Sequence, residues 1–231
     1  MSSQSVAAAG HTGPPKYSPQ ELERERRATL ASPRRSYGVA ARALFATMDL
    51  LYGRTRSLAK FKVLEIVARV PYQAWEQVAY IALTHRYSRT HLARRIFDRV
   101  VESRAQQDNE QWHLLILHEL IDERNLRDSL VRHRLIPQLL AFVYYQLSVA
   151  LYIVRPAWSY RLNADFEDHA EHEYALFVEE NAWLAVVAYD GQFAEEYGRY
   201  ASLGELFTQI SLDERHHKNE SLDKMAQPRF T

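Results

Sequence analysis

The sequence predicts an all-α protein built as one helical bundle, and three observations support that fold class. Long stretches after Ser36 have the apolar spacing of amphipathic helices, and no stretch alternates polar with apolar residues for long. Only seven glycines occur in 231 residues, which favours helices over a turn-rich β fold. Cysteine is absent, which excludes disulfides, thiolate metal sites and iron–sulfur clusters.

Length and charge indicate one globular domain with a polar lead-in. The chain is long enough for one sizeable core, and its formal net charge of zero gives no reason to expect a nucleic-acid partner. Residues 1–36 are rich in Ser, Ala, Pro and Arg, and we expect them to be mostly disordered with one short charged helix. Residues 37–226 form the predicted helical domain. The acidic residues of the lead-in are unusual for a mitochondrial presequence, which favours a bacterial origin.

Six helices joined by short connections are predicted, and together they indicate a bundle. The expected helices cover residues 38–56, 59–86, 89–124, 128–158, 163–189 and 199–225. The expected breaks fall at Gly53-Arg54, Tyr87-Ser88, Arg127-Asp128, Pro156 with Asn163, and Asp190-Gly191.

The fourth of these helices contains the most hydrophobic segment of the chain. Leu135–Val154 has no formal charge over twenty residues, about the length that spans a bilayer. Tyrosines within it and Trp158 after it give the aromatic content of a membrane interface. A central helix of a soluble bundle can also be apolar all round, so both interpretations are open at this point.

Two motifs on different helices indicate a metal site. Glu110-x-x-His113 and Glu214-x-x-His217 each place a carboxylate and an imidazole three residues apart, on one face of a helix. Two such pairs are half of a di-iron carboxylate site, whose other half is one inward Glu on each of two further helices. Oxygen and nitrogen ligands without thiolate suit iron or manganese.

The remaining ligands are less clear from the residues alone. Glu65 is the odd polar residue in the apolar stretch Val63–Val67, and Glu76 is its main rival one helix face away. Glu167 lies among several other acidic residues. His216 could compete with His217, which we prefer because it pairs with Glu214.

Four segments, in the same order along the chain, resemble the motifs of the alternative oxidases and especially their plastid terminal oxidase branch. They are Leu64–Tyr72, Asn109–Leu114, Phe166–Ala170 and Asp213–His217. The likeness extends from about Asp49 to Lys218, which is most of the predicted helical domain.

This resemblance implies a ferritin-like four-helix bundle that binds a di-iron centre, with two additional helices at a membrane interface. The two irons would be held by Glu65, Glu110, His113, Glu167, Glu214 and His217. Asn109 and Asp213 would orient the histidines, and Tyr174 would be a redox-active tyrosine. Lys60, Leu64, Phe166 and Ala170 would line the quinol pocket.

The implied activity is oxidation of ubiquinol or plastoquinol with reduction of dioxygen to water, without proton pumping. A related di-iron quinone monooxygenase and a non-enzymatic iron-binding bundle are the alternatives. Because the apolar helix lies between ligand positions, a crossing there would split the site, so we expect binding to one leaflet. We expect the cytoplasmic face of a bacterial inner membrane, with an organelle inner membrane as the alternative, and a homodimer is possible.

Some positions depart from the family pattern. Lys60 and Ser211 each replace an expected Arg, Asp168 and His169 interrupt a run of Glu, and Glu173 stands where Thr is frequent. These changes leave the predicted metal ligands intact and affect the expected quinol head-group site. The regulatory cysteines of plant enzymes are absent, so we expect no thiol-based control.

Overall fold

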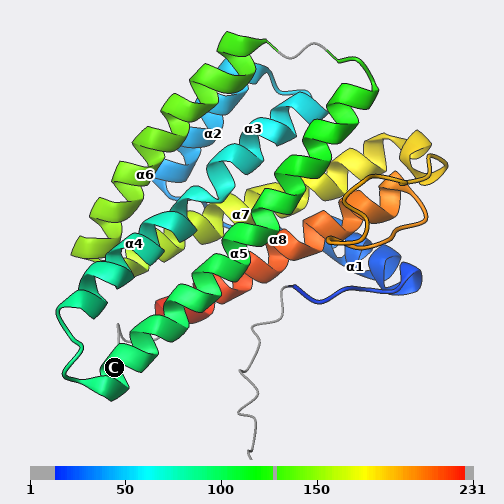
Figure 1. Ribbon diagram of the computed structural model, residues 1–231. Helices are drawn as coiled ribbons and strands as arrows, with labels where there is room; N and C mark the ends of the chain where they lie inside the picture. The colour runs from blue at the N-terminus through cyan, green and yellow to red at the C-terminus, as the bar shows by residue number, and fades with distance from the viewer. Residues whose placement is uncertain (1–13, 127–128, 227–231) are drawn as a thin grey trace, which may run out of the picture.

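A computed structural model describes residues 14–126 and 129–226, and within these residues every regular element is helical (Figure 1). The predicted all-α fold class is therefore confirmed. The α-helices are α1 (Pro19–Ala31), α2 (Val39–Tyr52), α3 (Leu58–Ala68), α4 (Val70–Thr84), α5 (Thr90–Glu123), α6 (Ile136–Val154), α7 (Pro156–Glu180) and α8 (Leu203–Ala226). A π-helical turn, η1 (Val131–Leu135), precedes α6, and a 3-10 turn, η2 (Ala182–Ala185), follows α7.

Four helical rods form the central bundle: α3 continuing into α4, α5, α7 and α8. α7 packs against α8, and α5 packs against α3 and α4. The rod of α3 and α4 is interrupted at Arg69, two residues before Pro71. Proline has no backbone N–H to donate, so the helix restarts there instead of running through.

α2 and α6 lie outside this bundle and extend one of its apolar layers. Both contact α7, and α6 also contacts α3 and α4. Phe45 of α2 and Tyr144 of α6 each lie against Phe166 of α7, with ring centroids 6.1 and 6.3 Å apart. The two helices are thus attached to the bundle by one shared apolar cluster.

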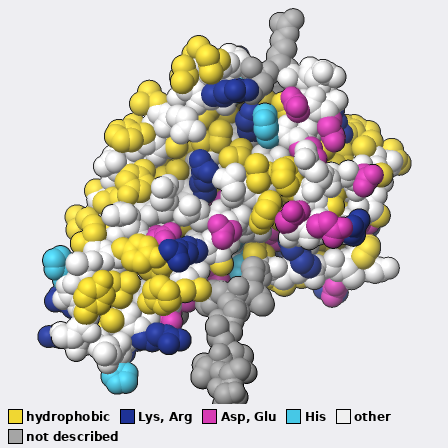
Figure 2. Space-filling model, viewed as in Figure 1, with side chains coloured by type: hydrophobic (Ala, Val, Ile, Leu, Met, Phe, Trp, Pro, Cys, Tyr) yellow, Lys and Arg dark blue, Asp and Glu magenta, His cyan; other side chains and the backbone are white. Residues whose placement is uncertain are grey.

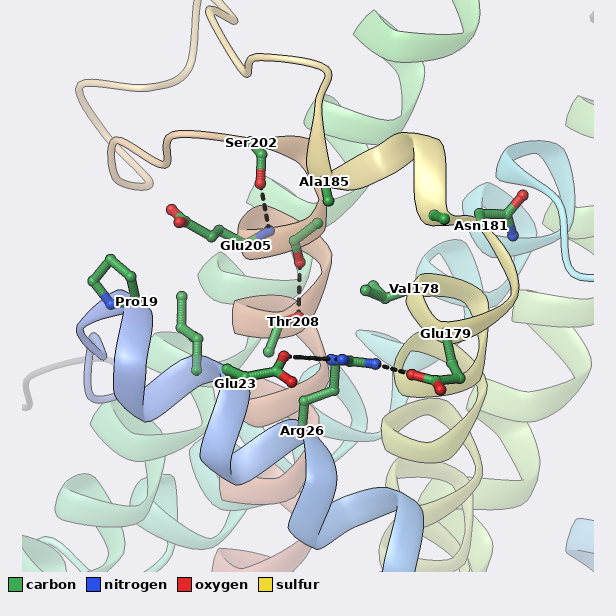
Figure 3. Close-up of a pocket in the computed structure, with 13 residues that line it drawn as sticks. Pro19, Glu23, Arg26, Val178, Glu179, Asn181, Ala185, Ser202, Glu205 and Thr208 are labelled. Atoms are coloured by element: carbon green, nitrogen blue, oxygen red, sulfur yellow. Dashed lines mark hydrogen bonds and ion pairs between the residues drawn. The ribbon is translucent and has the colours of Figure 1, made fainter.

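The charged stretch of the lead-in forms α1, which packs across α7 and α8. Ion pairs join it to both helices: Arg26, which also pairs with Glu23 within α1, pairs with Glu179 of α7, and Glu25 pairs with Arg215 of α8. Figure 3 shows Arg26 between its two carboxylates at the edge of a cavity of roughly 430 Å³. Residues 1–13 of the predicted lead-in lie outside the described residues.

Several predicted boundaries were wrong, for local reasons. α2 ends at Tyr52 and not at residue 56, because Gly53 takes a positive φ of 82°. The break expected between Pro156 and Asn163 is at Arg155 alone, since proline is favoured at the first position of a helix and Pro156 begins α7. α7 ends at Glu180, and η2 with irregular chain follows where a helix to residue 189 was expected. The break predicted at Arg127-Asp128 lies outside the described residues.

Candidate metal centre

Four helices bring six carboxylate and imidazole side chains together in the middle of the bundle. They are Glu65 of α3, Glu110 and His113 of α5, Glu167 of α7, and Glu214 and His217 of α8. Each has 0% exposure. These are the six residues that the sequence motifs pointed to, and the structure gathers all of them.

The cluster divides into two groups that share two carboxylates. One group contains Glu65 and His113, the other contains Glu167 and His217, and both contain Glu110 and Glu214. Within each group the candidate ligand atoms lie within 4.8 Å of one another. Two adjacent groups that share two carboxylates would suit a pair of metal ions.

The spacing of three residues on α5 and α8 aims each Glu-x-x-His pair inward. Nδ1 of His113 lies 3.1 Å from Glu214 Oε1 and 3.5 Å from Glu65 Oε2. Nδ1 of His217 lies 2.7 Å from Glu110 Oε1 and 3.9 Å from Glu214 Oε2. His113 Nδ1 also lies 3.7 Å from Glu110 Oε2, so each histidine faces a carboxylate of its own helix and at least one of another helix.

Most polar atoms of the cluster have no hydrogen-bond partner among the described residues. These atoms are Oε2 of Glu65, both oxygens of Glu110, Nδ1 of His113, Oε2 of Glu167, both oxygens of Glu214, and both nitrogens of His217. Charged atoms that lack hydrogen bonds in a dry interior are costly, and here four carboxylates face only two imidazoles. Two divalent cations would satisfy them, since four carboxylates balance their charge, so the residues fit a di-iron pair.

Without metal, protons must take the place of the cations. Burial and the neighbouring Glu214 raise the pKa of Glu65 well above its ordinary value, and burial with Glu110 does the same for Glu167. Burial would also raise the pKa of Glu110, but the adjacent His217 holds it well below the usual range. The pKa of His217 is raised to about 10, because Glu110 outweighs the effect of burial. Metal binding would thus release protons.

A second layer of contacts holds His113. Its Nε2–H donates to Asp213 Oδ2 at 3.2 Å, which leaves Nδ1 to face the carboxylates. Asn109 Nδ2 donates to the same oxygen at 3.2 Å. The structure therefore places Asn109 and Asp213 beside His113, while His217 has no such partner among the described residues.

Three contacts of this layer were not anticipated from the sequence. Tyr72 donates its hydroxyl to Glu167 Oε1 at 2.7 Å, and Tyr197 donates to Asp213 Oδ2 at 2.8 Å. Gln209 Nε2 donates to Asp213 Oδ1 at 2.7 Å. Tyr72 comes seven residues after Glu65, a spacing that could have identified it. Tyr197 lies in irregular chain, where no helical period applies.

The predicted redox tyrosine lies directly against the cluster. Tyr174 of α7 is fully buried, and its hydroxyl donates to Glu65 Oε1. The ring of Phe61 stacks on it with centroids 4.2 Å apart. Burial, and then the charge of Glu65, raise the pKa of Tyr174 well above its ordinary value, so the phenol keeps its proton.

The predicted quinol-pocket residues lie on the α2 side of the cluster. Leu64, Phe166 and Ala170 belong to the apolar cluster that joins α2, α3, α6 and α7. Lys60 is buried and uses its amine locally, donating to Asp49 Oδ1 at 2.7 Å and to the carbonyl of Gly53 at 2.9 Å. It thereby ties α3 to the end of α2.

The residues that rivalled the predicted ligands, and those that depart from the family pattern, make contacts outside the cluster. Glu76 pairs with Arg104 at 2.8 Å, and His216 pairs with Glu220 at 3.3 Å; neither is in the cluster. Glu173, in the place of a frequent Thr, is neutralised by arginines 34 and 56. Among the other departures, Asp168 binds Lys218 at 3.1 Å, and Ser211 donates to the carbonyl of Glu171 at 2.7 Å.

The chain is also similar in sequence to known proteins. Residues 26–223 match the family described as alternative oxidase. One similar protein is ubiquinol oxidase 4, chloroplastic/chromoplastic, of Arabidopsis thaliana, which is 36% identical over 131 residues. That match covers 57% of this chain and 34% of the relative, so it spans about a third of the relative's length.

Proposed function

Because the chain belongs to the alternative oxidase family, we propose that it is a quinol oxidase that reduces dioxygen to water at a di-iron centre. The observation that carries the proposal is the buried cluster of four carboxylates and two imidazoles, most of whose inward atoms have no hydrogen-bond partner among the described residues. A structural bundle would not retain four such carboxylates without a cation to balance them.

In this proposal Glu65, Glu110, His113, Glu167, Glu214 and His217 hold the two irons. The irons would supply the redox chemistry that reduces dioxygen with electrons from two quinols. The described residues keep the site dry, since all six ligands are fully buried. Asp213, itself held by neighbouring donors, keeps the proton of His113 on Nε2 and so presents Nδ1 to metal.

Tyr174 and Tyr72 each hold a proton beside one carboxylate of the cluster. Tyr174 donates to Glu65 and Tyr72 to Glu167, so each hydroxyl can pass hydrogen to or accept it from its carboxylate. Ala170 precedes Tyr174 by one helical turn on α7, and Leu64 directly precedes Glu65, the residue that accepts the Tyr174 hydroxyl; we place the quinol at Ala170 and Leu64. A proton and an electron leaving the quinol would reach Tyr174 first on this route.

We further propose that α6, with α2, attaches the protein to one leaflet of a membrane. The segment Val131–Val154 is long and apolar enough to cross a bilayer, yet only 22% of its most apolar window is buried. Hydrophobic side chains line the edge of the molecule that α6 forms (Figure 2). α6 does not cross, because helices before and after it contribute to the same cluster. A helix that exposes an apolar face without crossing the bilayer is typical of helices that lie in the membrane interface.

Oxygen uptake with added quinol tests this function. Membranes from cells that produce the chain should consume oxygen in the presence of cyanide, with two quinols oxidised for each dioxygen and water as the product. Membranes carrying Glu110→Ala serve as the matched control and should show no such uptake. Hydroxylated quinone among the products would indicate a monooxygenase, and no turnover by an iron-loaded protein would contradict an enzymatic role.

A further inference from the structure

The segment before α1, residues 14–18, lies across the outer contacts of the metal centre; we call it the N-terminal strap. Gln209 of α8 connects it to Asp213. The amide oxygen of Gln209 accepts the backbone N–H of Tyr17 at 3.2 Å, and its nitrogen donates to the carbonyl of Pro15 at 2.9 Å. The same nitrogen donates to Asp213 Oδ1 at 2.7 Å, so one buried side chain sets the position of the strap.

This tether places Lys16 over Asp213. Its Nζ lies 3.6 Å from Asp213 Oδ2 and 3.8 Å above the ring centre of Tyr197. Among the described residues Lys16 is the one Lys or Arg that forms an ion pair with Asp213. A cavity of roughly 680 Å³, lined in part by Lys16, Asn109 and Tyr197, opens beside this contact.

Asp213 needs a positive partner that the bundle does not provide. Its carboxylate has 0% exposure, and Asn109, Tyr197 and Gln209 are neutral donors. His113 is also neutral once Nδ1 binds a metal. A buried carboxylate with only neutral partners is costly, and four other carboxylates already match the charge of two divalent ions. The positive charge that remains for Asp213 is that of Lys16.

We propose that Lys16 is a positioning residue that acts on the metal through Asp213 and His113, an inference that rests on the proposed di-iron function. Its ammonium draws electron density from Asp213, and Asp213 then pulls less strongly on the Nε2 proton of His113. His113 becomes a weaker donor to iron, and the reduced state is favoured. Removing the charge should therefore lower the reduction potential of the centre.

The test compares three purified, iron-loaded variants with wild type. Lys16→Met should keep its iron, show a lower midpoint potential and lose about tenfold in kcat, the lower end of what outer partners of a ligand contribute. Lys16→Arg should restore both values. Arg27→Met removes a cation from α1 whose partner is Glu23, and it should behave as wild type. The side chain of Lys16 is 43% exposed, so its replacement opens no core cavity.

Each result decides between alternatives. The proposal is overturned if the midpoint potential of the Lys16→Met variant equals that of the Arg27→Met variant. If Lys16→Met holds too little iron for the measurement, Lys16→Arg decides: recovered iron and potential support a role for the charge, and no recovery overturns it. Wild-type protein that binds no iron would instead contradict the proposed function, which separates the two failures.

Discussion

The two histidines of the cluster are held in different ways. His113 is fixed by a hydrogen bond to Asp213, whereas His217 is held by packing, with the ring of Tyr72 at 5.7 Å in an edge-on arrangement. An imidazole with a hydrogen-bonded outer nitrogen has a defined tautomer and a defined donor strength. The proposed iron at His113 is therefore the one whose properties the surrounding residues adjust.

Tyr174→Phe should retain both irons and lose most of the oxidase activity. The substitution removes one hydroxyl that is not a proposed ligand and leaves the stacking with Phe61 in place. Loss of a proton-transfer group reduces kcat by on the order of a hundredfold. Iron analysis and quinol-dependent oxygen uptake on the same sample measure the two effects. Full activity of the Tyr174→Phe variant would mean that Tyr174 contributes only packing.

At this scale the sequence identified the residues that the structure gathers in the cluster better than the residues that surround them. The two Glu-x-x-His pairs follow from helical spacing alone, whereas Glu65 had a rival in Glu76 and Glu167 lies among other acidic residues, so these two depended on the family resemblance. Tyr197, Gln209 and Lys16 meet Asp213 only because a loop and the strap fold back over α8. No local pattern encodes such long-range contacts.

Among the elements, α6 has the most unusual surface. Leu139, Phe142 and Leu147 are 63%, 63% and 40% exposed, so they contribute little to the core of the described chain. A core helix of a soluble bundle would bury such residues. The exposure favours the interfacial interpretation over the core interpretation, between which composition alone could not decide.

Replacing Leu139, Phe142 and Leu147 together with Glu should release the protein from membranes with its iron still bound. Each large apolar side chain withdrawn from lipid removes roughly 1.5–3 kcal/mol of binding free energy. Membrane flotation followed by iron analysis of the soluble fraction measures the outcome. Gln77, His91 and Arg95 are exposed on α4 and α5, and placing Glu at these positions is the matched control. A triple variant that stays membrane-bound would place the attachment elsewhere.

The helices themselves were predicted well where a long amphipathic pattern exists, as for α5 and α8. Most boundary errors fell at proline or glycine, and the end of α7 is an exception. Pro71 divides one expected helix and Pro156 begins another, while the end of α7 at Glu180 has no strong stop signal in the sequence. Whether a proline interrupts or begins a helix depends on the packing around it, which residue patterns do not contain.

For the whole molecule, the candidate site exists only when the bundle is assembled. Its six residues come from α3, α5, α7 and α8, which are separated by as many as 152 positions between Glu65 and His217. Metal bound there would stabilise the folded state over the unfolded one, since an unfolded chain has no preformed site. The metal-free protein must instead keep several buried carboxyl groups protonated, as the raised pKa values of Glu65 and Glu167 indicate.

The iron content of purified protein is the most direct test of the di-iron centre. Wild type should contain two irons per chain, and Glu110→Ala should lose most of them, because Glu110 belongs to both groups of the cluster. Glu76→Ala, which removes a carboxylate paired with Arg104 outside the cluster, should stay near two. Wild-type protein without iron, or iron lost from Glu76→Ala and kept by Glu110→Ala, would contradict the assignment.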